Sequence, residues 1–82
     1  MDEQQALDLV MRLVARGRGV DVRALSPETS LVEDLGFDSL DASELLAALH
    51  TETGNSMQLS DISELRTIAD VARALSKQEV SS

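Results

Sequence analysis

Apolar residues recur at helical spacing along most of this 82-residue chain, and nothing in it alternates apolar and polar residues as a half-buried strand does. The first such pattern fits a helix over residues 2–16, because the repeat ends at the pair Arg16-Gly17. Its apolar stripe consists of Ala6, Val10, Leu13 and Val14, flanked by Leu7 and Met11. A chain built from such stripes is constrained to a helical fold.

A second helix is predicted within the stretch "LGFDSLDASELLAAL", residues 35–49, and the pair Thr53-Gly54 ends it. Ser60 is placed to cap a short third helix that runs through Leu65. The sequence therefore continues in helices after the second one.

The last helix is predicted from Thr67, which stands three residues before Asp70 in capping-box spacing. It carries Ile68, Val71, Ala72 and Leu75, and a polar tail follows at residues 78–82. We therefore expect an all-α fold, a small bundle of three longer helices plus one short helix.

A long loop separates the first and second helices, and the segment "SPETSLVEDLG" within it carries local order. Ser26 followed by Pro27 indicates a turn or a short helical start. Ser30 and Glu33 have capping-box spacing over a single turn that Gly36 closes. Because loops of this length in small domains are usually either functional or disordered, these capping signals favour a functional loop.

Size and composition exclude several classes of function. The chain forms one domain, residues 1–82, with a core at about 5–76; this leaves little room for a cleft, so we do not expect an enzyme. Cysteine is absent, which excludes disulfides and thiolate metal ligands, and we expect no metal site. No segment resembles a membrane span or an export signal, so we expect a soluble cytoplasmic protein, and a monomer.

The charge is unevenly distributed. All seven basic residues lie outside the middle of the chain, whereas nine acidic residues lie between Ala24 and Leu65. A net charge of −8, with one Phe and no Trp or Tyr, argues against a nucleic-acid partner. The acidic middle is either a solvated face that keeps a small domain soluble or a docking surface for a basic partner.

The second helix has two distinct faces when its residues are placed at 100° intervals. The core stripe consists of Ala42, Leu45, Leu46 and Leu49. The opposite face consists of Leu40, Glu44, Ala47 and Thr51. Leu40 is thus a large apolar side chain among small and acidic neighbours, which is typical of a docking anchor.

Ser39 stands at the start of this helix, and its role has two interpretations. Asp38 is a good N-cap and Asp41 stands where a capping-box acid belongs, so the hydroxyl of Ser39 would be free at the end of the loop. A phosphate ester on it would lie at the positive end of the helix dipole. Alternatively, Ser39 is itself the cap; the helix-start pattern alone leaves both readings open.

The stretch "DLGFDSLDASELLAAL" resembles the modification motif of acyl carrier proteins, in which Leu-Gly-x-Asp-Ser-Leu leads into an acidic and apolar helix. Upstream, "SPETSLVEDLGFDSL" resembles the loop of that family, and downstream "LRTIADVARAL" resembles its last helix. The likeness covers about residues 5–76. It adds to the helical pattern a specific expectation of function.

This resemblance implies a carrier rather than a catalyst. Ser39 would receive 4′-phosphopantetheine from coenzyme A through a phosphopantetheinyl transferase that uses magnesium, and the thiol of that arm would hold acyl groups as thioesters. A chain without cysteine fits this chemistry, because the sulfur arrives with the cofactor. The transferase and the acyl-loading, condensing and tailoring enzymes would dock through basic patches. The docking residues implied on this chain are Asp38, Leu40, Asp41, Glu44 and Ala47.

The branch of the family is indicated by fewer residues. Phe37 and the pair Thr53-Gly54 resemble polyketide-synthase carrier domains more than carriers of fatty acid synthesis. The second helix lacks arginines common in modular polyketide domains, and the chain has its own Met1, so we expect a freestanding carrier of a polyketide or related natural-product pathway. A carrier of fatty acid synthesis and an aminoacyl or peptidyl carrier remain alternatives.

Three apolar residues, Leu49, Met57 and Leu65, could line a gap between the second and third helices that shelters an acyl chain, or could be ordinary core. Two other classes of function also stay open. One is an acidic helical adaptor that binds a basic protein through Leu40 while Ser39 is never modified. The other is a calcium-binding helical pair, although the twelve-residue ligand spacing is missing.

Overall fold

The computed structural model describes residues 2–54 and 64–77. In these ranges the chain forms three α-helices and one turn of 3-10 helix, which confirms the all-α class. In chain order these elements are α1 (Glu3–Arg18), η1 (Val22–Ala24), α2 (Ser39–Thr53) and α4 (Ile68–Lys77). The short helix expected between Ser60 and Leu65 falls largely on residues outside the described ranges.

Helix α1 begins where its sequence predicts, and it ends two residues beyond its predicted end. The Asp2 carboxylate accepts the Gln5 N–H at 2.8 Å, and Gln5 returns a bond to the Asp2 N–H, so Asp2 is the N-cap. The expected end at Arg16-Gly17 is wrong, because the backbone stays helical through Arg18 and turns only at Gly19, whose φ is 70°. That positive φ suits glycine and closes the helix.

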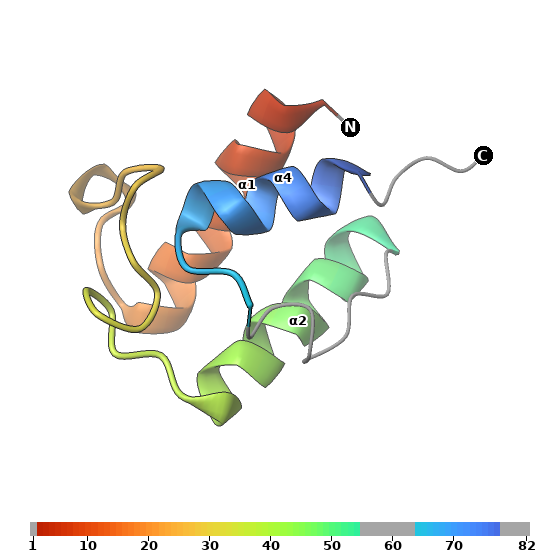
Figure 1. Ribbon diagram of the computed structural model, residues 1–82. Helices are drawn as coiled ribbons and strands as arrows, with labels where there is room; N and C mark the ends of the chain where they lie inside the picture. The colour runs from red at the N-terminus through yellow and green to blue at the C-terminus, as the bar shows by residue number, and fades with distance from the viewer. Residues whose placement is uncertain (1, 55–63, 78–82) are drawn as a thin grey trace.

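The core lies between α1 and the two other helices. Helix α1 packs against both α4 and α2, and Figure 1 shows it crossing behind α4 with α2 below. Leu25 and Leu31 of the loop also enter this core, although neither belongs to a helix. The buried helical residues are Ala6, Leu9, Val10, Leu13, Val14 and Ala15 of α1, Leu45 and Leu49 of α2, and Ile68, Val71, Ala72 and Leu75 of α4.

The long loop is held by hydrogen bonds at both of its predicted turns. At the first, the Ser26 N–H donates to Thr29 Oγ1 at 2.9 Å. At the second, Ser30 Oγ accepts the Glu33 N–H at 3.1 Å, as expected, but the carboxylate that bonds back to the Ser30 N–H, at 2.7 Å, belongs to Asp34. The loop is therefore ordered by its own side chains.

The loop is also tied to the start of α4. The Leu31 N–H donates to the Arg66 carbonyl at 2.9 Å, and the Ile68 N–H donates to the Thr29 carbonyl at 3.1 Å, around an isolated antiparallel bridge between Ser30 and Thr67. This pairing fixes the loop against the bundle before it turns toward α2.

Candidate functional site

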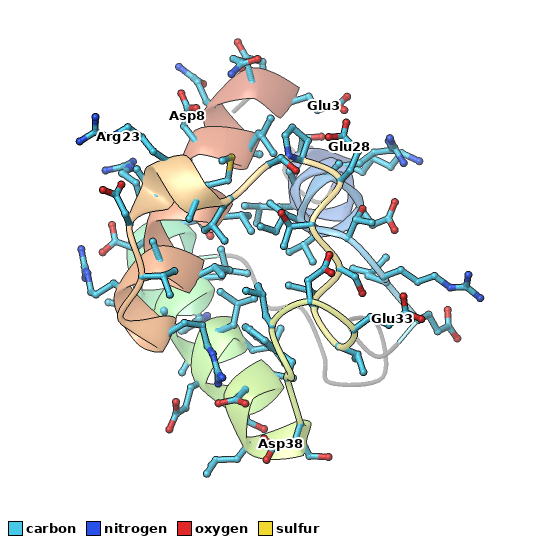
Figure 2. All side chains as sticks on the ribbon, turned by 90° about the vertical axis from the view of Figure 1, so that its left-hand side faces the viewer. Glu3, Asp8, Arg23, Glu28, Glu33 and Asp38 are labelled. Carbon is cyan, nitrogen blue, oxygen red and sulfur yellow. The ribbon has the colours of Figure 1, made fainter. Side chains whose placement is uncertain are left out.

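The start of α2 is closed by a reciprocal pair of carboxylates. Asp38 Oδ1 accepts the Asp41 N–H at 3.0 Å, and Asp41 Oδ2 accepts the Asp38 N–H at 3.3 Å. The extended backbone of Asp38 and these two bonds make it the N-cap of the helix. Figure 2 shows Asp38 at one extremity of the molecule, where the loop meets α2. The reading in which Ser39 is the cap is therefore excluded.

Ser39 is the first residue of α2, and its side chain is exposed. The hydrogen bonds of the described residues include none to its hydroxyl, and the capping bonds are made by Asp38 and Asp41 instead. The first turn of a helix also presents amides without intrahelical partners and the positive end of the dipole. An exposed hydroxyl at such a place has room for a phosphodiester and favourable electrostatics for it.

The same capping bonds alter the acidity of the Asp38 side chain. The Asp41 N–H, which donates to the Asp38 carboxylate, is the main cause that holds the pKa of this carboxyl below its ordinary value of 3.8. Asp38 therefore stays charged, and remains a cap, at any pH near neutrality.

The outward face of α2 has the composition that its sequence predicts. Leu40 is 65% exposed, and Glu44 and Ala47 are exposed on the same face. On the inner face Leu45 and Leu49 are buried, whereas Ala42 and Leu46 are half-buried. Leu45 and Leu49 are thus core residues and Leu40 is a surface residue, as expected, whereas Leu46 is only half-buried. Leu40 lies directly after Ser39.

Asp41 departs from the sequence-based expectation. Only 24% of its side chain is exposed, and its Oδ2 lies 3.0 Å from Nη1 of Arg18, the last residue of α1. As one of the docking residues that the resemblance implies, Asp41 was expected to be open to a partner, but it is partly buried and already paired with a cation from another helix. Glu44, three residues further along α2, has no ion pair in the described part of the chain.

Arg18 itself was not among the predicted site residues. Its guanidinium carbon lies 5.8 Å from the centroid of the Phe37 ring. The Arg18 side chain therefore contacts one residue before Ser39 in the sequence, Phe37, and one after it, Asp41. Arg18 and Asp41 are 23 positions apart, and no local pattern pairs them. The unusual density of arginine and glycine in "ARGRG" was the one available signal.

A cavity of about 340 Å³ lies between α1 and α2 beneath this contact. It is lined by Leu13, Val14, Arg16, Gly17, Arg18, Phe37, Asp41, Glu44, Leu45 and Ala48. None of the residues expected to shelter an acyl chain is in this lining. Leu49 is a core residue with 1% exposure, Leu65 is half-buried, and Met57 lies outside the described residues.

The described residues offer neither a metal site nor a membrane span. Within residues 2–54 and 64–77 no three His, Cys, Asp or Glu side chains are grouped so that they could hold a metal ion. In the same ranges no helix has the length and apolar character needed to cross a membrane. Ser39 and the surface around it thus remain the candidate site.

Comparison with known proteins places this chain in a family. Residues 8–75 match the family described as "Phosphopantetheine attachment site". The acyl carrier protein of Thermosynechococcus vestitus is 38% identical over 71 residues, which are 87% of this chain and 88% of that protein. The acyl carrier protein of Saccharopolyspora erythraea is 32% identical over 71 residues, 87% of this chain and 75% of that protein.

A solved structure agrees in fold. The apo doublet acyl carrier protein from prodigiosin biosynthesis superposes with a TM-score of 0.77 at 25% identity, covering 95% of this chain and 38% of that longer chain. Proteins of this family are not enzymes; they carry a covalent 4′-phosphopantetheine and interact with phosphopantetheinyl transferases and biosynthetic enzymes. The sequence match, the two relatives and the shared helical fold show that this chain belongs to the acyl carrier protein family.

Proposed function

We propose that Ser39 is the residue of this carrier protein to which 4′-phosphopantetheine is attached. The proposal rests on one observation at the start of α2. Asp38 caps the helix, and the Ser39 hydroxyl is exposed and has no partner among the described residues. The family match spans this position. A helix start that is capped by another residue can accept a bulky substituent on Ser39 without losing its cap.

Attachment requires a displacement at phosphorus. The Ser39 Oγ–phosphorus bond forms while the pyrophosphate bond of coenzyme A breaks, adenosine 3′,5′-bisphosphate leaves, and the hydroxyl proton passes to a base that the transferase supplies. The chain's own contribution is to hold Ser39 at a fixed, exposed position through the Asp38 and Asp41 bonds. Once bound, the arm supplies a thiol that holds acyl groups as thioesters.

The docking face proposed for partner enzymes is the outward side of α2, formed by Leu40, Glu44 and Ala47, with Asp38 and Asp41 at its start. Its exposed leucine fits an apolar socket, and its carboxylates fit a basic rim. Because exposed ion pairs contribute only about 0.2–1 kcal/mol each, docking through this face should be weak and sensitive to salt. Such docking suits a protein that visits several enzymes in turn.

For the pathway, we propose polyketide or related natural-product synthesis. The support is the likeness of Phe37 and Thr53-Gly54 to polyketide-type carriers and the structural similarity to a carrier of prodigiosin biosynthesis. Deletion of the gene should abolish one specialised product and leave growth on minimal medium normal. Loss of growth that added fatty acids restore would instead assign the carrier to fatty acid synthesis.

The attachment site can be tested with purified protein. Incubation with coenzyme A, magnesium and a promiscuous phosphopantetheinyl transferase should add one phosphopantetheine to the wild type, as read by intact mass. Ser39→Ala should gain none. Ser43→Ala, which removes another exposed serine of α2, should be modified like the wild type. An unmodified wild type, or a modified Ser39→Ala, would favour the acidic adaptor or another site.

A further inference from the structure

Arg18 is held on two sides at the end of α1. Its guanidinium forms an ion pair of 3.0 Å with Asp41 and lies over the ring of Phe37. The exposed fractions of the Arg18 and Asp41 side chains are 34% and 24%; each is lower than that of the corresponding basic or acidic partner in the other ion pairs of the described residues. An arginine with both a carboxylate and a ring as partners is more restrained than one on an open surface.

The oxygen that binds Arg18 has a second role in the site. Asp41 Oδ2 also accepts the N–H of Asp38, the residue just before Ser39. The contact from α1 therefore reaches the proposed attachment point through one shared oxygen atom. A partner's cation that approached the same oxygen would meet a position that Arg18 already fills.

Two of the carboxylates of the docking face, Asp41 and Glu44, consequently differ. Asp41 is engaged by Arg18, whereas Glu44 is exposed and has no ion pair among the described residues. Replacing the internal pair by an external one exchanges one partly solvated ion pair for another, so the net gain is small. Asp41 should thus contribute little to docking for as long as Arg18 stays in place.

We propose that Arg18 is an internal competitor for the docking face: a basic side chain of a partner protein reaches Oδ2 of Asp41 only by displacing Arg18. This proposal rests on the carrier function and docking face described above. It makes Arg18 a residue that sets docking strength, and it assigns first contact with a partner to Leu40 and Glu44. The occupant that it predicts at Asp41 in the complex is a lysine or arginine of the partner.

The test compares Arg18→Gln with Arg12→Gln, which removes the same charge from an exposed position of the same helix. Each variant is assayed as a substrate of the phosphopantetheinyl transferase at physiological ionic strength, where long-range charge effects are screened. Arg18→Gln should lower the KM for the carrier roughly two- to fivefold with kcat unchanged, and Arg12→Gln should change it less. Arg18→Lys, which keeps the charge but loses the planar fork, should fall between wild type and Arg18→Gln.

Adding Asp41→Asn to each background provides the decisive comparison. The competition predicts that Asp41→Asn raises KM more in the Arg18→Gln background than in the wild-type or Arg12→Gln background. Equal effects in all three would overturn the proposal. So would a fall in kcat without a change in KM, because Arg18 would then act only on the shape of the helix start.

A titration with a tetra-arginine peptide separates this proposal from the carrier function. Observed through the amide resonances of Asp38 and Asp41, Arg18→Gln should bind the peptide more tightly than Arg12→Gln, whether or not Ser39 can be modified. Equal affinities would contradict the competition even if attachment to Ser39 is confirmed. Failure of the wild type to accept phosphopantetheine would instead contradict the assignment of Ser39 and leave the peptide result to decide the role of Arg18.

Discussion

Leu40 and Val32 are exposed to nearly the same degree, 65% and 64%, but only Leu40 lies beside Ser39 on the proposed docking face. Their similar exposure makes Val32 a matched control. Because a docking anchor loses its apolar contact when it is truncated, Leu40→Ala should lower the kcat/KM of modification about five- to tenfold. Val32→Ala should leave that rate unchanged.

Thermal melts of both variants accompany this comparison. Surface substitutions change the free energy of unfolding by about 0.5 kcal/mol or less, so both variants should melt close to the wild type. If Leu40→Ala and Val32→Ala are modified at the same rate, Leu40 is an ordinary surface leucine.

Asp70, at the start of α4, predicts how stability depends on pH. The N–H groups of Arg66 and Thr67 donate to its carboxylate, at 3.1 and 3.2 Å, and they hold the pKa of this carboxyl below 3.8. A pKa that is lower in the folded protein adds stability above the unfolded value, and this stability is lost as the pH falls through the folded value. Melting temperatures measured from pH 6 to pH 2 should therefore fall less steeply for Asp70→Asn than for the wild type.

The control for this titration is Glu28→Gln, which removes an exposed carboxylate from the loop. Its melting temperature should follow the wild-type curve. Parallel curves for Asp70→Asn and the wild type would show that these capping bonds add no pH-dependent stability.

At the scale of elements, the start of α4 is a third capping box, after those of α1 and α2. Thr67 Oγ1 accepts the Asp70 N–H at 3.2 Å, and the buried stripe of the helix begins with the next residue, Ile68. Loss of this cap in Thr67→Ala should reduce the free energy of unfolding by about 1 kcal/mol, as measured by urea denaturation. Thr67→Ser keeps the hydroxyl and should recover most of that loss; equal destabilisation of the two variants would argue against capping.

The elements that sequence predicts well are those whose signals are local. The starts of α1, α2 and α4 each depend on a side chain and an amide three residues apart, and all three starts are found where Asp2, Asp38 and Thr67 place them. The end of α1 was misjudged because Gly17 and Gly19 are equally good local stop signals. Gly19 takes the positive φ, so the helix includes Arg18, and Arg18 contacts residues that are distant in the sequence. Local signals do not contain those contacts.

At the scale of the whole molecule, the sequence does not show which distant residues contact one another. Leu31 bonding to Arg66 and Arg18 bonding to Asp41 join residues far apart in the chain, and neither pair has a periodic signature. The exposure of the outward face of α2 follows from local spacing and was predictable. The ion pair of Asp41 with Arg18 depends on the tertiary structure and was not. The charges read along the sequence therefore predicted more unpaired carboxylates on that face than the structure has.

The net charge of −8 belongs to the whole molecule, and it should attract basic partner proteins. Association steered by opposite charge slows as salt shortens the range of the field. Raising ionic strength from about 0.01 M to about 0.15 M should therefore raise the KM for modification while kcat stays constant. Glu44→Arg should raise KM at low salt and reduce its salt dependence; an unchanged salt dependence would place docking elsewhere.

The central claim is that this carrier works through an arm on Ser39, and peptide mapping of the protein isolated from the cells that make it tests this claim most directly. The predicted result is phosphopantetheine, as free thiol or thioester, on the peptide that contains Ser39 and localised to that residue by fragmentation. A Ser39 peptide that is unmodified in all of the isolated protein would contradict the claim and favour the unmodified acidic adaptor.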